Sequence, residues 1–169
     1  MAFFFGVCLS LNNSIKPVLV AGLGNPLAGD EGIGIALVEK LSALAEQGKL
    51  PSDAVEYLDA GTGGMRLLHK LDGRKKLILI DCAKMGQKPG TIRRFSPEDV
   101  KSVKQLAGLS LHEMDILKLL DLGEQLGHRP AEVVIFGIEP ACLELNPHLS
   151  AELSARFDSY IEVITSEIC

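Results

Sequence analysis

Short apolar segments alternate along this chain with longer segments in which apolar residues recur at helical spacing. Four of the apolar segments are typical of strands buried on both faces; they are 17–22, 55–58, 77–80 and 133–136. Helical spacing follows at 30–46, 65–71 and 114–126, and a closing helix is predicted around 153–164. This order predicts an α/β domain with a mainly parallel sheet, to which residues 91–95 add an edge strand.

The composition is that of one globular domain. A chain of 169 residues has the usual size of a single domain and buries roughly 70% of the surface of its unfolded form. Apolar residues make up 47% of the sequence, and no uncharged apolar run reaches about 18 residues, which excludes intrinsic disorder and membrane insertion. Nucleic-acid binders are usually basic and aromatic, whereas this chain has a net charge of −5, no Trp and two Tyr. We therefore expect no nucleic-acid partner.

The first residues and the cysteines bear on where the protein acts. An apolar run precedes Lys16, whereas a secretory signal peptide carries its positive charge before the apolar run. We therefore interpret residues 1–15 as a flexible N-terminal arm or a misassigned start, and residues 16–169 as the folded domain. The four cysteines, at positions 8, 82, 142 and 169, have no C-x-x-C spacing, which indicates reduced thiols and a cytoplasmic protein.

Acidic side chains and one histidine follow the predicted strands at one edge of the sheet. Ligands of open α/β sheets bind outside the carboxyl ends of the strands, so residues at these ends are the candidates for chemistry. The candidates are Asp30, Glu31, Asp59, Asp81 and His112. Gly29 or Asp30 is also predicted to cap the first helix, and the glycines around it are expected to permit a tight strand-to-helix turn.

Three chemistries compete for this edge. Dinucleotide binding would use Gly22 and Gly24, but the third glycine of that fingerprint is replaced by Leu27. A cysteine hydrolase would pair Cys82 with His112; however, Cys82 follows Asp81 on a strand, so the two side chains are predicted to point to opposite faces. The third is a metal site in which two carboxylates and one imidazole leave coordination positions open, an arrangement that suits Ni²⁺ or Zn²⁺.

The motifs along the chain resemble those of the hydrogenase maturation endopeptidases. The resemblance covers residues 16–168, nearly the whole chain, with the motifs in the order expected for the family. The matching motifs are Gly22-x-Gly24-Asn25, Asp30-Glu31-Gly32-x-Gly34, Asp59-Ala60-Gly61-Thr62, Ile80-Asp81, Ser110-x-His112 and Gly137-Ile138-Glu139-Pro140.

The resemblance implies an activity and a site. Members of this family remove a short C-terminal extension from the large-subunit precursor of [NiFe] hydrogenase after nickel insertion, and the nickel belongs to the substrate, so no intrinsic cofactor is expected. By motif, the catalytic and metal-contacting positions fall on Glu31, Asp81 and His112. The implied fold is a three-layer α/β/α sandwich with a twisted, mainly parallel sheet (phosphorylase/hydrolase-like), and the implied class is an aspartic-type peptidase.

The remaining acidic and polar residues receive supporting roles in this mechanism. Either Asp81 or Asp59 could serve as the general base that activates water. Asp30, Asp59 and Thr62 are expected to orient the metal-contacting side chains.

Two alternative functions remain open. One is a checkpoint protein that binds the nickel-loaded precursor without cutting it. The other is a peptidyl-tRNA hydrolase, a family that shares the Gly-Leu-Gly-Asn-Pro segment at residues 22–26. That family then requires a basic, histidine-containing segment, whereas residues 29–32 here are Gly-Asp-Glu-Gly and would repel RNA phosphates.

Overall fold

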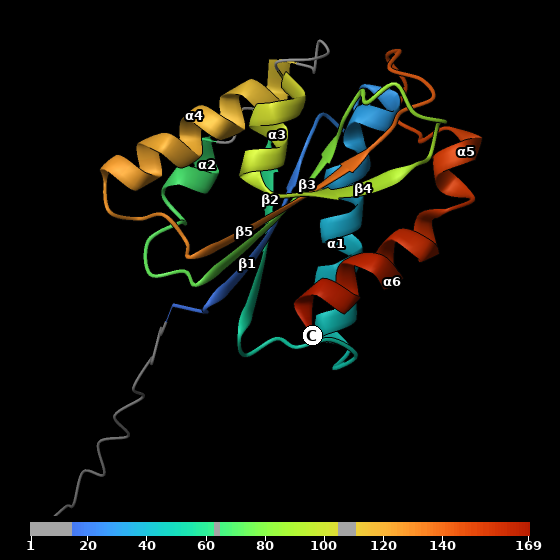
Figure 1. Cartoon of the computed structure of the whole chain (residues 1–169). Coiled ribbons are helices and arrows are strands. Elements are labelled where there is room, and N and C mark those ends of the chain that lie inside the picture. Colours follow the sequence, from blue (N-terminus) through green and yellow to red (C-terminus); the bar gives the residue numbers. More distant parts are fainter. Residues whose placement is uncertain (1–14, 63–64, 105–110) are drawn as a thin grey trace, which may run out of the picture.

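A twisted sheet lies between two layers of helices (Figure 1). The computed structural model describes residues 15–62, 65–104 and 111–169. These residues form a single α/β domain, so the predicted three-layer α/β/α fold is confirmed. Apart from Ile15, the predicted N-terminal arm lies outside the described residues.

The described strands form a five-stranded sheet in the order β2-β1-β3-β5-β4. Neighbouring strands are parallel except for β4, which runs antiparallel to β5 and confirms the predicted edge strand. The strands are β1 (Val18–Leu23), β2 (Val55–Gly61), β3 (Lys76–Cys82), β4 (Ile92–Phe95) and β5 (Glu132–Ile138). All three central strands therefore direct their carboxyl ends toward the same edge, where the candidate residues were predicted.

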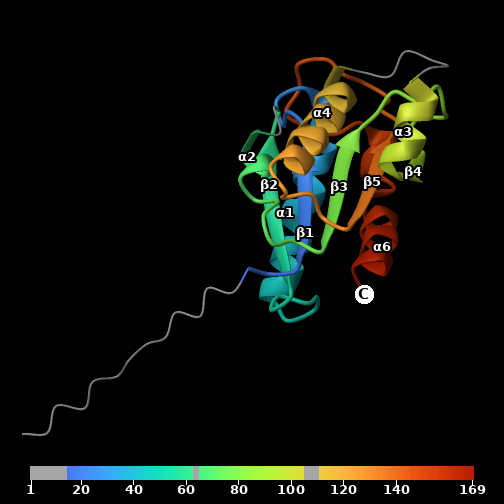
Figure 2. The same cartoon turned by 60° about the vertical axis from the view of Figure 1, so that its left-hand side comes forward.

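Helices cover both faces of the sheet (Figure 2). One layer consists of α1 (Ile33–Glu46), α5 (Ala151–Ser154) and α6 (Phe157–Ile168). The other layer consists of α2 (Met65–Leu68), α3 (Pro97–Lys104) and α4 (Leu111–Gln125). A short 3-10 helix, η1 (Gly29–Gly32), precedes α1 and carries two of the candidate carboxylates.

Alternation along β3 divides the core into two apolar clusters. Leu77 and Leu79 pack with the layer of α2, α3 and α4. Ile78, Ile80 and Cys82 pack with the layer of α1, α5 and α6. Because successive strand residues point to opposite faces, Asp81 points to the face covered by α4. The prediction that Asp81 and Cys82 point to opposite faces is confirmed.

Glycines let the start of α1 pack directly against the strand ends. A Cβ atom on Gly34 would lie 2.3 Å from the Leu23 carbonyl oxygen and 2.4 Å from that of Ile80, far inside contact distance. A Cβ on Gly22 would likewise lie 2.1 Å from the Gly34 oxygen. The expected tight strand-to-helix turn is confirmed, and it brings η1 against the end of β3.

Several helix boundaries differ from the prediction. The predicted capping role of Gly29 or Asp30 was wrong, because Ala28 precedes η1 and Gly32 is the residue before α1. The closing helix is divided into α5 and α6. Helix α3 was not predicted, although its start carries a recognisable signal: Ser96 and Asp99 each accept a hydrogen bond from the other's backbone amide.

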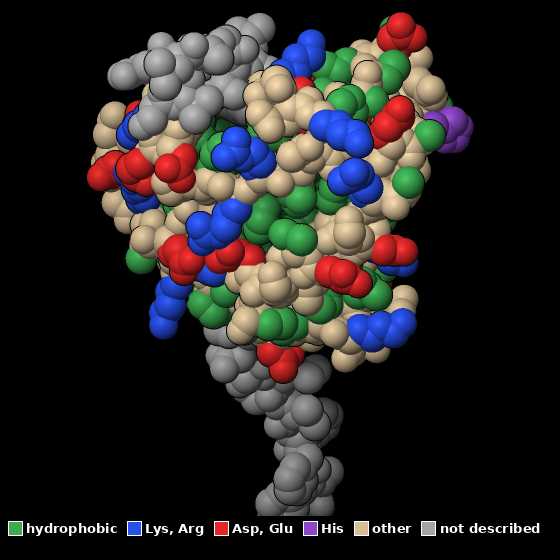
Figure 3. Space-filling view, turned by 45° about the vertical axis from the view of Figure 1, so that its right-hand side comes forward, with side chains coloured by type: hydrophobic (Ala, Val, Ile, Leu, Met, Phe, Trp, Pro, Cys, Tyr) green, Lys and Arg blue, Asp and Glu red, His purple; other side chains and the backbone are tan. Residues whose placement is uncertain are grey.

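Charged side chains of both signs are interspersed over the face shown in Figure 3, which is the right-hand side of Figure 1 turned forward. The chain as a whole has a net charge of −5. Within the described part of the chain, no helix has the length and apolar character needed to span a membrane.

Glu167 joins α6 to the amino end of β3 and to the edge strand β4. Its carboxylate accepts hydrogen bonds of 2.7 Å from Lys76 Nζ and 2.7 Å from Arg94 Nε. These bonds, from Arg94 above all, lower the pKa of Glu167 to about 2. A lowered carboxylate pKa stabilises the folded state above the ordinary value of 4.5, and this stabilisation is lost as the pH falls from 4.5 toward 2.

We expect Glu167→Gln to lower the free energy of unfolding by about 1–3 kcal/mol at pH 6, because the variant loses the negative charge that accepts hydrogen bonds from Lys76 and Arg94. The difference between wild type and variant should shrink as the pH falls from 4.5 toward 2, because the Glu167 carboxylate is protonated in the unfolded state before it is protonated in the folded state. Urea unfolding at pH 6 and pH 3 measures both effects. Glu162→Gln, an exposed change on the same helix, is the matched control and should alter neither value. If the free energies of unfolding of wild type and Glu167→Gln differ by the same amount at both pH values, the pKa of Glu167 is not lowered as described.

Candidate functional site

Asp81 is a buried carboxylate at the carboxyl end of the central strand β3. The residue is only 2% exposed, and its Oδ1 accepts a 2.8 Å hydrogen bond from the backbone amide of Cys82. Its register partner on β5 is Gly137, which has no side chain to fill the same face. Burying a carboxylate costs folding free energy, and residues that carry this cost are frequent at functional sites. Asp81 is therefore the central residue of the candidate site.

Negative charge gathers around the end of β3. Burial raises the pKa of the Cys82 thiol, and the neighbouring charges of Asp81, Asp30, Glu31 and Glu139 raise it further. The structure therefore brings three of the predicted carboxylates, together with Glu139, into one electrostatic environment. A thiol with a raised pKa is a poor nucleophile, so Cys82 serves as a buried apolar side chain of the core rather than as an attacking group.

Glu31 is half-buried in η1, which packs against β3. The close approach that Gly34 permits fixes this placement, since η1 leads directly into the start of α1. Glu31 and Asp81 therefore reach the same edge from two elements that are distant in sequence.

The Asp30 carboxylate is fully buried and is bound to the loop that follows β5. Its Oδ2 accepts hydrogen bonds from the amides of Ala141 (2.8 Å) and Cys142 (2.9 Å), and its Oδ1 accepts one from Ser150 (2.7 Å). Burial by itself would raise the pKa of Asp30, but these hydrogen bonds outweigh burial and lower it. Asp30 thus fixes the 141–150 loop against η1, the element that carries Glu31.

Asp59 and Thr62 lie on the edge strand β2 or just after it, and both are exposed. Asp59 Oδ1 accepts a 2.8 Å hydrogen bond from the Gly61 amide, which closes a local turn. Val55 and Tyr57 pack on the face of α1, so alternation places Asp59 on that face, opposite to Asp81. Because β1 lies between β2 and β3, the structure does not bring Asp59 next to Asp81.

His112 is the second residue of α4. In Figures 1 and 2 the N-terminal end of α4 lies at the same end of the sheet as the carboxyl ends of the central strands. The structure does not describe the His112 side chain, so its role in the site stays a prediction. Among the described side chains, no group of three or more His, Cys, Asp or Glu residues is arranged to hold a metal ion.

Glu139 is a functional candidate that sequence reasoning did not assign. It follows β5 directly, is 7% exposed, and its Oε2 accepts hydrogen bonds from the amides of Met85 (2.7 Å) and Gln87 (3.0 Å). It therefore holds the β3–β4 loop in the way that Asp30 holds the 141–150 loop. The sequence does carry a signal for Glu139, because it comes soon after a predicted buried strand, as Asp81 does.

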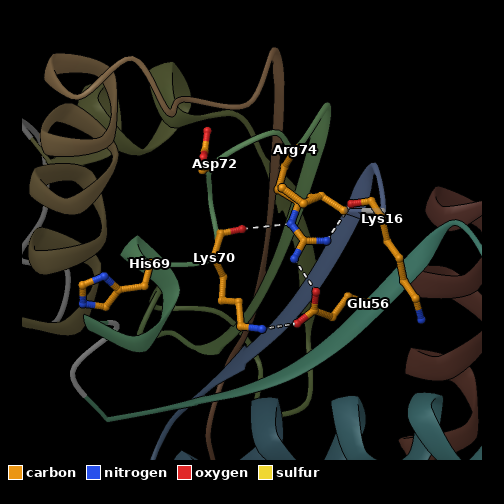
Figure 4. Close-up of a pocket in the computed structure, with 7 residues that line it drawn as sticks. Lys16, Glu56, His69, Lys70, Asp72 and Arg74 are labelled. Carbon is orange, nitrogen blue, oxygen red and sulfur yellow. Dashed lines mark hydrogen bonds and ion pairs between the residues drawn. The ribbon is translucent and has the colours of Figure 1, made fainter. Parts of the chain in front are cut away.

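A pocket of about 510 Å³ lies at the opposite, amino end of the sheet (Figure 4). Arg74 donates hydrogen bonds there to the carbonyl oxygens of Lys70 (2.9 Å) and Lys16 (2.6 Å), and to the Glu56 carboxylate. Figure 4 shows the His69 ring turned away from Arg74. These interactions join the amino ends of β1, β2 and β3, whereas ligands of parallel sheets bind at the carboxyl ends, so we assign this pocket a structural role.

The carboxyl edge has the chemistry needed for metal-dependent recognition or for activation of water. It combines the buried carboxylate of Asp81, the more accessible carboxylate of Glu31 and the start of the helix that carries His112. Oxygen and nitrogen ligands of this kind suit borderline divalent cations, and a carboxylate in such surroundings can act as a general base.

Known proteins are similar to this chain in sequence and in fold. The model of the hydrogenase maturation protease family HycI matches residues 35–167, a range that includes Asp81 and His112. A putative hydrogenase maturation protease from Methanocaldococcus jannaschii is 33% identical over 158 residues, which cover 90% of this chain and 97% of that protein. The hydrogenase expression/formation protein HupD of Rhodobacter capsulatus is 35% identical over 78% of this chain, but the match spans 61% of HupD.

Solved structures agree with these matches. The hydrogenase maturating endopeptidase HybD from Escherichia coli superimposes with a TM-score of 0.76 and 31% identity, over 89% of this chain and 90% of HybD. A [NiFe] hydrogenase maturation protease, HybD from Thermococcus kodakarensis, gives a TM-score of 0.69 and 28% identity, over 90% of this chain and 99% of that protein. The chain therefore belongs to the hydrogenase maturation protease family, a family of peptidases.

Proposed function

We propose that this protein is the endopeptidase that removes the C-terminal extension of a [NiFe] hydrogenase large-subunit precursor after nickel has been inserted. The observation that carries the proposal is the buried carboxylate of Asp81 at the carboxyl end of β3, with Glu31 beside the same strand end. Family membership supports the peptidase activity, and the acidic edge supports recognition of a cation. The partner is the precursor itself, and we propose a cytoplasmic site of action.

Nickel enters this mechanism as part of the substrate, so the protein needs no cofactor of its own. Glu31, Asp81 and His112 would contact the nickel of the precursor and thereby place its scissile peptide bond over the sheet edge. A bound metal can orient a substrate and polarise a carbonyl group. Two carboxylates and one imidazole form a suitable ligand set for such a contact.

Asp81 is the best placed general base. A buried carboxylate can accept a proton from a water molecule that attacks the scissile carbonyl carbon, and no covalent intermediate is then required. The raised pKa of the Cys82 thiol argues against a cysteine nucleophile. An aspartic-type mechanism is therefore part of the proposal, with Asp30 fixing the loop beside the site.

Direct binding of divalent metal tests the ligand set without the hydrogenase. At a Ni²⁺ concentration of 100 times the dissociation constant, a ligand that binds only the folded state stabilises it by about 2.7 kcal/mol. For a domain of this size that corresponds to a rise in melting temperature of about 5–11 °C. The rise should fade below about pH 6, since His112 must be neutral to bind metal and an ordinary histidine has a pKa near 6.5.

The matched histidine variants decide whether the predicted site is responsible. His112→Ala should lose most of the thermal shift, whereas His148→Ala, an exposed change on the 141–150 loop, should keep it. Differential scanning fluorimetry with Ni²⁺, Zn²⁺ and Cd²⁺ gives the comparison. If millimolar metal produces no shift, or if His112→Ala responds like wild type, these three residues do not bind metal together.

A further inference from the structure

A cleft of about 350 Å³ opens between the loops that follow β3 and β5. Its lining residues are Lys84, Gly86, Glu139, Pro140, Ala141 and Leu143. These loops leave the carboxyl ends of two neighbouring parallel strands, which is where α/β proteins bind their ligands. Lys84 follows Asp81 by three residues, so one wall of the cleft begins within about 10 Å of Asp81.

Glu139 fixes the wall contributed by the β3–β4 loop. Besides the two amides bound by its side chain, its backbone oxygen accepts a 2.8 Å hydrogen bond from the Gly90 amide, and its own amide donates a 2.9 Å bond to the Thr91 oxygen. One buried residue thus holds the middle and the far end of the loop. The wall is formed before any ligand binds, which reduces the entropy lost on binding.

The same loop is also positioned relative to Asp81. The Met85 Sδ atom lies 3.3 Å from where a Cβ on Gly137 would be, so the Met85 side chain covers Gly137 on the face that Asp81 shares. Glu139 binds the Met85 amide, and Asp30 binds the amides of Ala141 and Cys142 in the opposite wall. The buried carboxylates of Glu139 and Asp30 therefore fix the positions of the two walls of the cleft relative to Asp81.

The lining of the cleft has a defined chemistry. Ala141 and Leu143, both exposed, provide apolar surface, and Leu143 is 38% exposed; Pro140 also lines the cleft but is buried. Lys84 is exposed and is the one basic residue among those lining the cleft in the described part of the chain. A site of this kind suits an extended peptide that carries an apolar side chain and, next to it, a carboxylate.

We propose that this cleft binds the segment of the precursor next to the scissile bond, with an apolar side chain against Ala141 and Leu143 and a carboxylate at Lys84. This inference rests on the proposed function. Lys84 contacts the substrate, and Glu139 is a positioning residue that acts through the β3–β4 loop.

Steady-state kinetics on the full precursor test the contact. Lys84→Glu should raise KM about 5- to 20-fold, because it replaces attraction between Lys84 and the substrate carboxylate by repulsion. It should change kcat less than twofold, because this contact is equally strong in the bound substrate and in the transition state. Lys88→Glu makes the same charge change at an exposed position of the same loop outside the cleft, and its KM should stay within twofold of wild type. Equal KM values for the two variants would overturn the contact.

Glu139 variants test the positioning role. Glu139→Ala should raise KM at least fivefold, whereas Glu139→Gln retains an acceptor oxygen and should recover most of the loss. Faster amide exchange at Met85 and Gln87 in the Ala variant alone would identify the loop as the mediator. A similar KM for Glu139→Ala and wild type, with both folded, would exclude the positioning role.

Binding without cleavage separates this inference from the proposed function. A synthetic peptide spanning the C-terminal region of the precursor is titrated, up to millimolar concentration, into wild-type protein labelled for NMR, so that binding weakened by the absence of nickel is still detected. Shifts of the Lys84, Gly86 and Ala141 amides support the cleft even if the wild-type protein fails to cut the precursor. If wild type cuts the precursor and these amides do not shift, the cleft inference is wrong and the proposed function stands.

Discussion

Asp81→Asn is expected to abolish processing while leaving the fold intact. Removing a general base lowers the rate by about 10²–10⁴-fold, and loss of a metal contact would add to this. The variant retains an oxygen that can accept the Cys82 amide hydrogen bond. It also removes a buried negative charge from a site crowded with carboxylates, so the free energy of unfolding should stay equal or rise by about 0.5–2 kcal/mol. Mass spectrometry of the precursor and urea unfolding measure the two effects.

Asp30→Asn is the matched control, because it makes the same one-group change at the neighbouring buried aspartate. The Asp30 carboxylate accepts three backbone hydrogen bonds, and an amide NH₂ in place of one oxygen would face at least one of these donors. We expect a loss of about 2–4 kcal/mol in the free energy of unfolding. If Asp81→Asn instead loses more than about 3 kcal/mol, Asp81 is a structural carboxylate.

The contrast between these two aspartates shows what local sequence can and cannot predict. Asp81 ends an apolar run, and the two-residue period of a strand fixes its face relative to Cys82. Asp30 precedes a helical pattern, which favours a capping role by local rules. Its actual partners lie 111, 112 and 120 residues away, and no local signal marks them.

Glu139 and Asp59 illustrate the same limit for the candidate site. Glu139 was noted only as part of a motif, because the amides that it binds lie 54 and 52 residues away along the chain. Asp59 follows a predicted strand and so reaches the correct edge. Its face depends on how β2 pairs with β1, and this pairing directs it away from Asp81. Periodicity thus predicts the edge, while long-range hydrogen bonds and register decide which side chains meet there.

Cleavage is expected to depend on nickel in the precursor. The charges of Asp81, Asp30, Glu31 and Glu139 all act at the end of β3, and a divalent cation carried by the substrate would offset part of this concentrated negative charge. Each 1.4 kcal/mol of lost binding weakens the complex tenfold, and loss of a metal contact removes several such increments. We therefore expect nickel-free precursor to be processed at least 10²-fold more slowly than nickel-loaded precursor. The measurement is the loss of mass at the precursor C-terminus over time.

Two controls and two alternative outcomes determine how this result is interpreted. Insertion of nickel into the same precursor preparation should restore cleavage, which excludes a misfolded substrate as the cause. Asp81→Asn protein mixed with nickel-loaded precursor should leave its mass unchanged, which shows that the protein and not the metal performs the hydrolysis. Binding of loaded precursor by wild type without any loss of mass would instead identify a nickel checkpoint. Equal cutting of loaded and nickel-free precursor would mean that the enzyme recognises the polypeptide alone, and Glu31 and His112 would then need another role.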